Sequence, residues 1–315
     1  MTTDTLGRET GLQTRPAEHR VSVIILNYNT SNDLRTCLRS VQQTRVGMDQ
    51  DAIETFVVDN ASTDGSADMV AAEFPWVKLI RADRNGGYAY GNNLALRESS
   101  GRYVMLLNPD ALIPPGAIEA LYDYLDAHPR AAVVGPRVLR PDGSLDLACR
   151  RSFPTLEVSS YRMLGLSKLF PRSRKFGRYN LTYLDADEGA EVDSVVGACM
   201  LVRRAAIEQV GLLDEQFFMY GEDLDWAFRM KQAGWSILYH PGVTVLHRKG
   251  ESSRRRSEAA TVAFYDAMEI FYRKHYARQH SGLVNALVQL AIRSRCAISQ
   301  LQNALRPEGK RRVGT

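Results

Sequence analysis

The sequence holds little of what marks secreted, redox-active or membrane-spanning proteins. Its four cysteines among 315 residues lie far apart and form no C-x-x-C pair, which argues against a disulfide framework and against a zinc or redox motif. No apolar run reaches the roughly 20 residues that span a membrane. The polar N-terminal segment lacks the apolar core of a signal peptide. We therefore expect reduced thiols and a cytoplasmic protein.

The chain also lacks a strong charge of either sign. Lys and Arg number 40 and Asp and Glu 36, and the resulting net charge of +4 gives no reason by itself to expect nucleic acid. Basic side chains gather around residues 172–178, 248–256 and 310–312, with no nucleic-acid recognition motif beside them. Solvated faces account for these clusters, and we expect no nucleic-acid partner.

Hydrophobic patterning predicts an α/β domain over residues 20–253, after a polar and disordered leader at 1–19. Short β-branched runs that are typical of buried strands alternate with helical periodicity, which favours a mostly parallel, Rossmann-like sheet flanked by helices. The predicted strands of this first part are Val21–Leu26, Ile53–Val58, Val77–Ile80 and Tyr103–Leu107, and the helices are Asp33–Gln43, Tyr90–Ser99 and Pro115–Ala127.

The pattern is less regular after residue 131. The segment 145–191 is rich in Arg, Pro, Tyr and Ser and permits no assignment. Regular pattern returns at Val192–Val202, in a helix that begins near Glu222, and in strands at Ser236–Tyr239 and Val243–Leu246. These elements close the domain.

Residues 254–315 form a predicted C-terminal helical extension. Its second apolar stretch, Leu283–Ile292, is flanked by basic residues and is too short to span a bilayer. Such a helix could lie on a membrane surface, or pack on the domain or on a partner subunit. Peripheral membrane contact and a homo-oligomer therefore both stay open.

Polar motifs follow the first two predicted strands. Asn27 and Asn29 come after the first, and Asp59 begins a turn-rich segment after the second. Ligands of open α/β sheets bind in the crevice at the carboxyl ends of strands. Asp59 could accept a hydrogen bond from a nucleobase or a ribose there, although turn formation alone also explains such residues.

A glycine-rich loop spans residues 83–93 and leads into a helix. It contains Arg84 and Asn85, and its glycines would let the backbone approach a ligand near a helix N-terminus, which favours anions. The loop does not follow the first strand, as a dinucleotide fingerprint would, and it lacks the G-K-[ST] end of a P-loop. This disfavours a nicotinamide oxidoreductase.

Two further features are candidates for metal chemistry. Asn108 and Asp110 directly follow a buried strand, where a carboxylate can hold a divalent cation beside a diphosphate, although N-P-D is also an ordinary turn. His247 ends the last predicted strand, and a lone histidine carries little information.

An acidic motif lies at the start of a predicted helix. Glu222, Asp223 and Asp225 fall within four positions among aromatic residues. Acids in a first turn commonly interact with the helix dipole. A partly apolar pocket can also raise the pKa of a carboxyl group and poise it as a general base.

In their order along the chain, these five motifs resemble glycosyltransferase family 2, with the GT-A fold and an inverting reaction. The resemblance runs from about Val21 to Ser253, and the L-N-P-D and F-M-Y-G-E-D-L-D-W spellings are most similar to the bacterial rhamnosyltransferase branch. It implies a nucleotide-sugar donor, bound by Asn27, Asn29, Asp59, Arg84, Asn85, Asn108 and Asp110.

The resemblance also implies further roles. Asp110 would hold Mg²⁺ or Mn²⁺, and His247 would be a second metal ligand or a diphosphate contact. Asp223 would be the general base with Glu222 beside it, and the acceptor side would include Trp226, Asp225 and Cys199. The family usually has Asp-x-Asp where this chain has Asn108, so a single acid would share the metal with substrate phosphates.

The expected reaction is transfer of a sugar, with L-rhamnose from dTDP-rhamnose as the leading donor, to a glycan or polyprenyl-diphosphate-linked saccharide of a cell wall or surface polysaccharide. UDP- and GDP-sugars stay open as donors. A non-catalytic nucleotide-sugar-binding protein is disfavoured because it would not need both Asp223 and His247. A nucleotidyltransferase is disfavoured because no Gly-rich basic loop follows the first strand.

Overall fold

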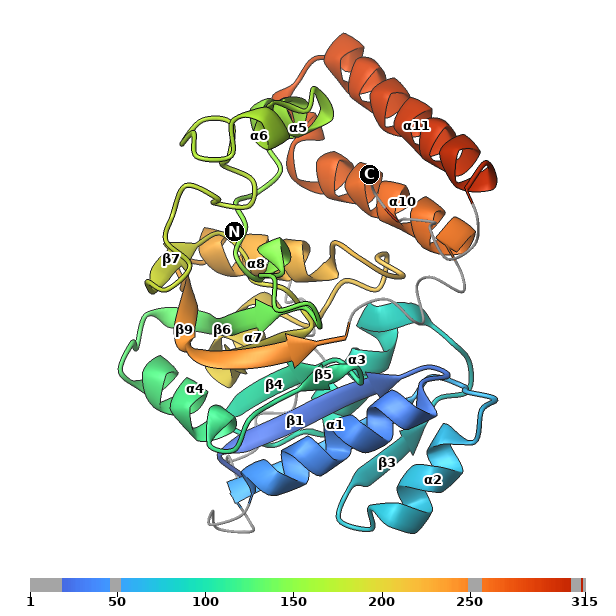
Figure 1. Cartoon of the computed structure of the whole chain (residues 1–315), viewed down its shortest axis with the longest axis vertical. Coiled ribbons are helices and arrows are strands. Elements are labelled where there is room, and N and C mark those ends of the chain that lie inside the picture. The colour runs from blue at the N-terminus through green and yellow to red at the C-terminus, as the bar shows by residue number, and fades with distance from the viewer. Residues whose placement is uncertain (1–18, 46–51, 249–256, 307–312, 314–315) are drawn as a thin grey trace, which may run out of the picture.

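The computed structural model describes residues 19–45, 52–248, 257–306 and 313 (Figure 1). Most of the predicted leader, the loop at 249–253, and the basic residues at 254–256 and 310–312 lie outside these ranges. Within them, no helix is long and apolar enough to cross a membrane. All four cysteines are free thiols.

The first half of the sheet is parallel. Strands β1 (Val21–Asn27), β2 (Ile53–Asp59), β3 (Lys78–Arg81) and β4 (Tyr103–Leu107) lie in the order β3-β2-β1-β4. The helices that connect them are α1 (Ser31–Thr44), α2 (Ser66–Glu73) and α3 (Gly87–Glu98). Every strand and two of the three helices were predicted to within a few residues. The exception is α2, which the sequence analysis did not assign.

The second half of the sheet changes direction. Strand β8 (Cys199–Arg203) runs antiparallel to both β4 and β6 (Ala131–Leu139). Strand β9 (Ser236–His247) is parallel to β6 and antiparallel to β5 (Ala111–Leu112) and β7 (Ala190–Val192). The predicted α/β class is confirmed, and the sheet that carries it is mixed.

Strand β9 was predicted as two strands and forms one. Its register against β6 shifts between Pro136 and Arg137, which pair with His240 and Thr244. The extra residues of this bulge contain a proline and a glycine, which is why the sequence pattern breaks there. The bulge lets one strand continue to His247, beside the start of β5.

Both faces of the sheet are covered by helices (Figure 1). One core cluster packs α1, α2 and α4 (Ala117–Asp126) against the sheet, and α1 contributes Leu34, Cys37, Leu38 and Val41 at helical spacing. The other packs α3, α7 (Arg204–Val210) and α8 (Glu222–Gln232) against the opposite face. The central strands β1, β2 and β4 are therefore buried on both sides, as their apolar runs predict.

The segment without a sequence assignment contains short helices: η2 (Leu147–Cys149), α5 (Leu156–Met163) and α6 (Leu166–Leu169). The C-terminal extension consists of α10 (Ser257–His275), η3 (Ala277–Gln279) and α11 (Gly282–Ala304). In Figure 1, α5, α6, α10 and α11 form the upper end of the molecule, and α1, α2 and β3 form the lower end.

Candidate active site

A hydrogen-bond network joins the carboxyl ends of β1 and β2. The Asn27 amide donates to Asp59 Oδ1 at 3.0 Å and to Ser62 Oγ at 3.1 Å, and the Ser62 amide donates to Asp59 Oδ2 at 3.0 Å. Asn29, with a φ of 55°, accepts from the Thr63 amide at 2.7 Å. The structure thus brings the predicted Asn27, Asn29 and Asp59 together, and it fixes the orientation of the Asp59 carboxylate.

The glycine-rich loop is fastened to this network by Asn60. Its amide group donates to Asn85 Oδ1 at 2.9 Å and its Oδ1 accepts from the Gly86 amide at 3.2 Å. Gly87 has a φ of +88°, and a Cβ there would lie 2.2 Å from the Phe218 carbonyl oxygen. The loop therefore needs glycine at this position to pack against the start of the acidic motif.

Arg84 lies on the exposed side of the same loop. Its guanidinium forms an ion pair with Asp83 at 3.1 Å and lies 4.5 Å from the centre of the Tyr90 ring. Tyr90 in turn donates to Asp83 at 2.7 Å. Arg84 is thus held outward at the loop, where an anionic ligand can reach it.

Asp110 and His247 lie together at the ends of β4 and β9. His247 Nε2 is 3.1 Å from Asp110 Oδ1 and 3.5 Å from the Asn108 amide nitrogen. On the other side of the ring, Nδ1 is 3.7 Å from Asp146 Oδ2. The pairing of Ala111 with His247 across β5 and β9 produces this arrangement.

This donor set fits a divalent cation that is shared with a substrate. In the described part of the chain, no group of three or more His, Cys, Asp or Glu side chains could hold a metal. A carboxylate and an imidazole together can supply two ligands, and substrate phosphates can complete the coordination. A carboxylate behind the imidazole, as Asp146 is here, orients a ligating histidine.

Asp223 is held by a buried arginine. Its Oδ2 accepts from Arg151 Nη2 at 2.7 Å and from the Gly197 amide at 3.0 Å, and its Oδ1 accepts from the Leu224 amide at 2.7 Å. Burial alone would lower the pKa of Arg151, but the facing Asp223 carboxylate and the nearby Tyr179 together raise this pKa above its ordinary value. The guanidinium therefore stays charged and holds the Asp223 carboxylate in one orientation at the start of α8.

Glu222 stands beside this pair in a different state. Burial, and then the negative charge of Asp223, raise the pKa of Glu222 from 4.5 to about 8. Among the residues that the structure describes, none forms a hydrogen bond with Glu222 Oε2, which is buried. Glu222 is therefore protonated at neutral pH, and its buried carboxyl group keeps an unused hydrogen-bonding oxygen.

The three residues predicted on the acceptor side are buried. Asp225 forms ion pairs with Arg229 at 2.9 Å and with Lys274 and His275 at 2.7 Å, so it fastens α10 to α8. The Trp226 indole donates to the Gly211 carbonyl at 2.9 Å, and Cys199 is fully buried in β8. Asp225, Trp226 and Cys199 therefore pack below the site and hold its elements in place. Asp225 and Trp226 could contact an acceptor directly only if α8 and its neighbours rearranged.

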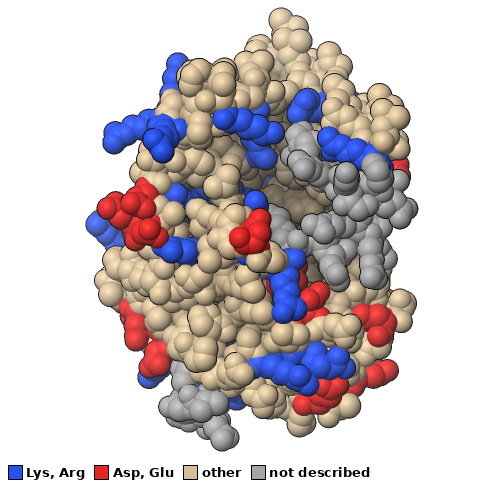
Figure 2. Space-filling view, viewed as in Figure 1, with Lys and Arg blue, Asp and Glu red and all other residues tan. Residues whose placement is uncertain are grey.

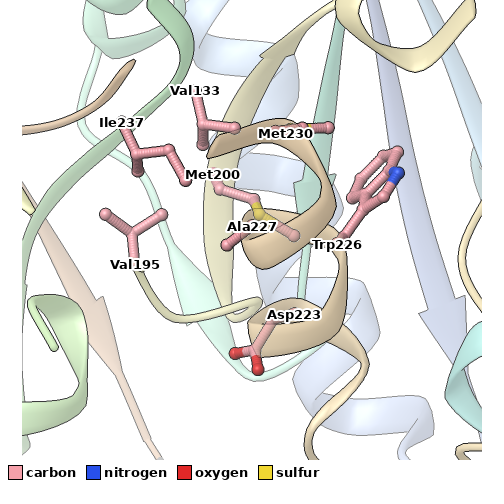
Figure 3. Close-up of a pocket in the computed structure, with 8 residues that line it drawn as sticks. All are labelled: Val133, Val195, Met200, Asp223, Trp226, Ala227, Met230 and Ile237. Atoms are coloured by element: carbon pink, nitrogen blue, oxygen red, sulfur yellow. The ribbon is translucent and has the colours of Figure 1, made fainter. Parts of the chain in front are cut away.

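Figure 3 shows the surroundings of the buried Trp226 side chain. It lines a narrow cavity between α8 and the sheet, with Met230 beside it and Met200 across from it. Asp223 is the one charged residue at this cavity's wall among the residues described. An apolar flank therefore lies behind the carboxylate and keeps that side dry.

Backbone contacts join the metal-ligand candidates to the acidic motif. The backbone amide of Asn108 donates to the Ala198 carbonyl at 2.8 Å, and the backbone amide of the adjacent Gly197 donates to Asp223. Tyr88, from the glycine-rich loop, donates to the Gly197 carbonyl at 2.8 Å. The predicted motifs thus meet at one edge of the sheet, and Figure 2 shows the molecule hollowed below the C-terminal helices.

Sequence reasoning missed Arg151, Asp146, Asn60 and Tyr88 as parts of this site. Arg151 and Asp146 lie in the segment without an assignment, and their partners are distant in sequence. Asn60 and Tyr88 lie within recognised motifs, where their spacing gave no separate signal. Of the four, only Asn60 directly follows a strand, and this position could have indicated it as a site residue.

Comparison with known proteins agrees with this geometry. A model of the family described as Glycosyl transferase family 2 matches residues 22–211. The chain is 32% identical over 275 residues to the N-acetylglucosaminyl-diphospho-decaprenol L-rhamnosyltransferase of Mycobacterium tuberculosis, which covers 83% of this chain and 87% of that protein.

Two solved structures are similar in fold. One is the mannosyltransferase PcManGT from Pyrobaculum calidifontis in complex with GDP-Man and Mn²⁺, with 18% identity, a TM-score of 0.54 and 91% of each chain covered. The other is S. aureus TarS 1-349 in complex with UDP-GlcNAc, with 16% identity, a TM-score of 0.55, and 87% of this chain and 71% of that chain covered. These similarities confirm the predicted GT-A fold.

Proposed function

Because the chain belongs to glycosyltransferase family 2, we propose that this enzyme inverts the anomeric centre while transferring L-rhamnose from dTDP-rhamnose to a polyprenyl-diphosphate-linked saccharide. The observation that carries the proposal is the continuous edge from Asp110 and His247, through Asn108 and Gly197, to Asp223. It provides a place for a diphosphate next to a fixed carboxylate.

The nucleoside end of the donor would bind at β1 and β2. Asp59 is oriented by Asn27 and by the Ser62 amide, so its remaining lone pairs can accept from a base N–H or a ribose hydroxyl. Asn29 and Asn85 shape the two sides of this place. Arg84 would bring a positive charge to the phosphates from the loop.

Asp110 and His247 would hold Mg²⁺ or Mn²⁺, and the PcManGT complex with Mn²⁺ supports such a site in this fold. When bound, the ion would neutralise charge that develops on the departing nucleoside diphosphate. Asn108 adds no charge of its own but can donate a hydrogen bond to a phosphate or ribose oxygen.

Asp223 would act as the general base. Arg151 and the Gly197 amide fix the direction of its carboxylate, so the carboxylate can take the proton of an acceptor hydroxyl. The hydroxyl oxygen would then form a bond to the anomeric carbon from the side opposite the diphosphate, whose bond to that carbon breaks. Attack from that side inverts the configuration.

Protonated Glu222 would have a separate task. Its neutral carboxyl can donate a hydrogen bond to a sugar or acceptor oxygen, which an ionised glutamate could not do. This division of roles follows from the surroundings of the two acids. Asp223 bonds directly to the Arg151 guanidinium, whereas at Glu222 burial and the like charge of Asp223 outweigh the attraction of Arg151.

The acceptor class is inferred from the relative that acts on a diphospho-decaprenol-linked sugar. Such an acceptor would be met at the cytoplasmic face of a membrane, where the protein would be peripheral. The loop from 248 to 253, which by family resemblance would cover the donor, lies largely outside the described residues.

A donor panel tests the proposal. The purified protein is incubated with dTDP-, UDP- and GDP-sugars, Mg²⁺ or Mn²⁺, and a polyprenyl-diphosphate-linked acceptor, and the product's anomeric configuration is read by NMR. We expect transfer from dTDP-rhamnose with inversion. Transfer from a UDP- or GDP-sugar instead would correct the donor, and a retained configuration would contradict the role of Asp223. No turnover of any donor would refute the proposal.

A further inference from the structure

The C-terminal helix α11 presents a row of large apolar side chains to the outside. In α11 and at its C-cap, six of them are exposed by 45% to 80%: Leu283, Leu287, Leu290, Ile298, Leu301 and Leu305. A surface helix of a globular protein normally turns this kind of side toward the core. We refer to these six side chains as the outward stripe.

The inward side of α11 is held by polar contacts with α10. Ser299 Oγ lies 2.8 Å from the Tyr265 hydroxyl, and Asn285 accepts from the Tyr272 hydroxyl at 2.7 Å. Asn285 also donates to the Ala277 carbonyl at 3.0 Å. These bonds fix which side of α11 faces outward, so the stripe is a property of the fold.

The charged residues of α11 itself are all basic. Between His275 and Leu305 the sequence contains no Asp or Glu, while Arg278, Arg293 and Arg295 are present. Arg293 pairs with Glu269 of the neighbouring α10 at 3.0 Å, and 69% of its side chain stays exposed. An apolar stripe with basic flanks complements an anionic lipid surface, into which apolar side chains insert while the basic ones meet phosphates.

A second segment at the same end has the same character. Leu164, Leu169 and Phe170, in and after α5 and α6, are exposed by 74%, 69% and 47%. No acidic residue occurs from Val158 to Leu184, a stretch with six Lys or Arg residues: Arg162, Lys168, Arg172, Arg174, Lys175 and Arg178. Figure 1 places α5, α6 and α11 at the upper end of the molecule, and Figure 2 shows Lys and Arg on both sides of that end.

We propose that the outward stripe of α11, together with the α5–α6 segment, docks the enzyme on an anionic lipid bilayer. This deepens the proposed function and rests on it only for the lipid-linked acceptor. Docking at the upper end would keep the sheet and its nucleotide-binding edge in water while the hollow below the C-terminal helices lies near the lipid surface.

Vesicle flotation of the full-length protein tests this surface. Vesicles of phosphatidylcholine with about 30% phosphatidylglycerol are compared with vesicles of phosphatidylcholine alone. Both are tested at low and high salt, because salt screens the attraction between basic side chains and anionic lipids. We expect binding to the anionic vesicles that falls at least fivefold at high salt. Replacing two stripe residues, Leu287→Gln with Leu290→Gln, should weaken it at least tenfold, and Leu169→Gln should weaken it by a smaller factor.

Two controls keep the result interpretable. Leu147→Gln changes an exposed leucine outside the docking surface, and it should float like the wild type. Unchanged thermal unfolding of the double variant shows that it folds. Transfer to a short-chain, water-soluble acceptor is measured in parallel: it should persist in the double variant, so loss of docking and failure of the proposed function are read separately.

Other outcomes would overturn the proposal. Equal binding by the wild type and the double variant would show that another surface holds the membrane. Absence of vesicle binding, with a dimer in solution that the double variant dissociates, would assign the stripe to a second copy of the chain.

Discussion

The buried pair of Arg151 and Asp223 permits the sharpest mechanistic prediction. Arg151→Met removes the guanidinium whose Nη2 lies 2.7 Å from Asp223 Oδ2 and keeps most of the side-chain volume. This bond fixes the direction of the Asp223 carboxylate, and a catalytic group that is displaced by about 1 Å can lose about 10²-fold in rate. The kcat of transfer should therefore fall by about that factor, with the affinity for the nucleoside diphosphate unchanged.

The same substitution should also cost stability. Removing one partner of a buried ion pair leaves an uncompensated charge and typically destabilises a protein by about 3–5 kcal/mol. Urea unfolding gives this quantity. Assays are therefore made at a temperature at which the variant stays folded, as circular dichroism verifies.

Arg150→Met is the matched control. Arg150 is also buried, but its guanidinium donates to the carbonyl oxygens of Asp185 and Leu184 and faces no carboxylate in the described contacts. This variant should lose stability and keep the wild-type kcat. Arg151→Lys should restore part of the rate. A wild-type kcat in Arg151→Met would contradict the role of Arg151 in orienting the catalytic carboxylate.

Three further predictions follow from the site. Between pH 4.5 and about 8 the folded state keeps a proton on Glu222 that the unfolded state has lost, so stability falls as pH rises through this window. Glu222→Gln should remove that fall, gaining about 3 kcal/mol at pH 7 and almost nothing at pH 4 in urea unfolding; equal gains at both pH values would contradict the assigned state. Alanine at a position with positive φ lowers the free energy of unfolding by roughly 1–2 kcal/mol. Gly87→Ala should lower it by more than this, because the new Cβ would also meet the Phe218 carbonyl. Gly116→Ala, where the space around the new Cβ is open, should lower it by that amount only, as thermal unfolding can measure. Asp110→Asn should raise the Mn²⁺ concentration needed for half-maximal transfer at least tenfold, and a metal-independent wild type would exclude the proposed ion site.

Local patterns predicted the first half of the fold well. The runs that became β1, β2 and β4 are apolar on both faces, and α1 shows its buried side at helical spacing. The reversal of direction at β8 was not predictable in this way, because a short buried strand reads the same whether its neighbour is parallel or antiparallel.

The site shows a similar division. Asp59, Asp110 and Asp223 each follow or begin an element, so their positions at one edge of the sheet could be predicted from the chain order. The roles of neighbouring acids could not, because Glu222, Asp223 and Asp225 differ only in their surroundings. Arg151 and the ion pairs of Asp225 with α10 come from segments distant in sequence, and only the folded structure brings them there.

The general-base role of Asp223 is tested most directly by single-turnover transfer with Asp223→Asn. The affinity for the nucleoside diphosphate is measured in the same protein. Asp142→Asn, in an exposed turn, is the control. We expect unchanged nucleotide affinity and a loss of transfer of about 10²–10⁴-fold, the usual contribution of a general base. Transfer at the wild-type rate by Asp223→Asn would contradict the general-base role.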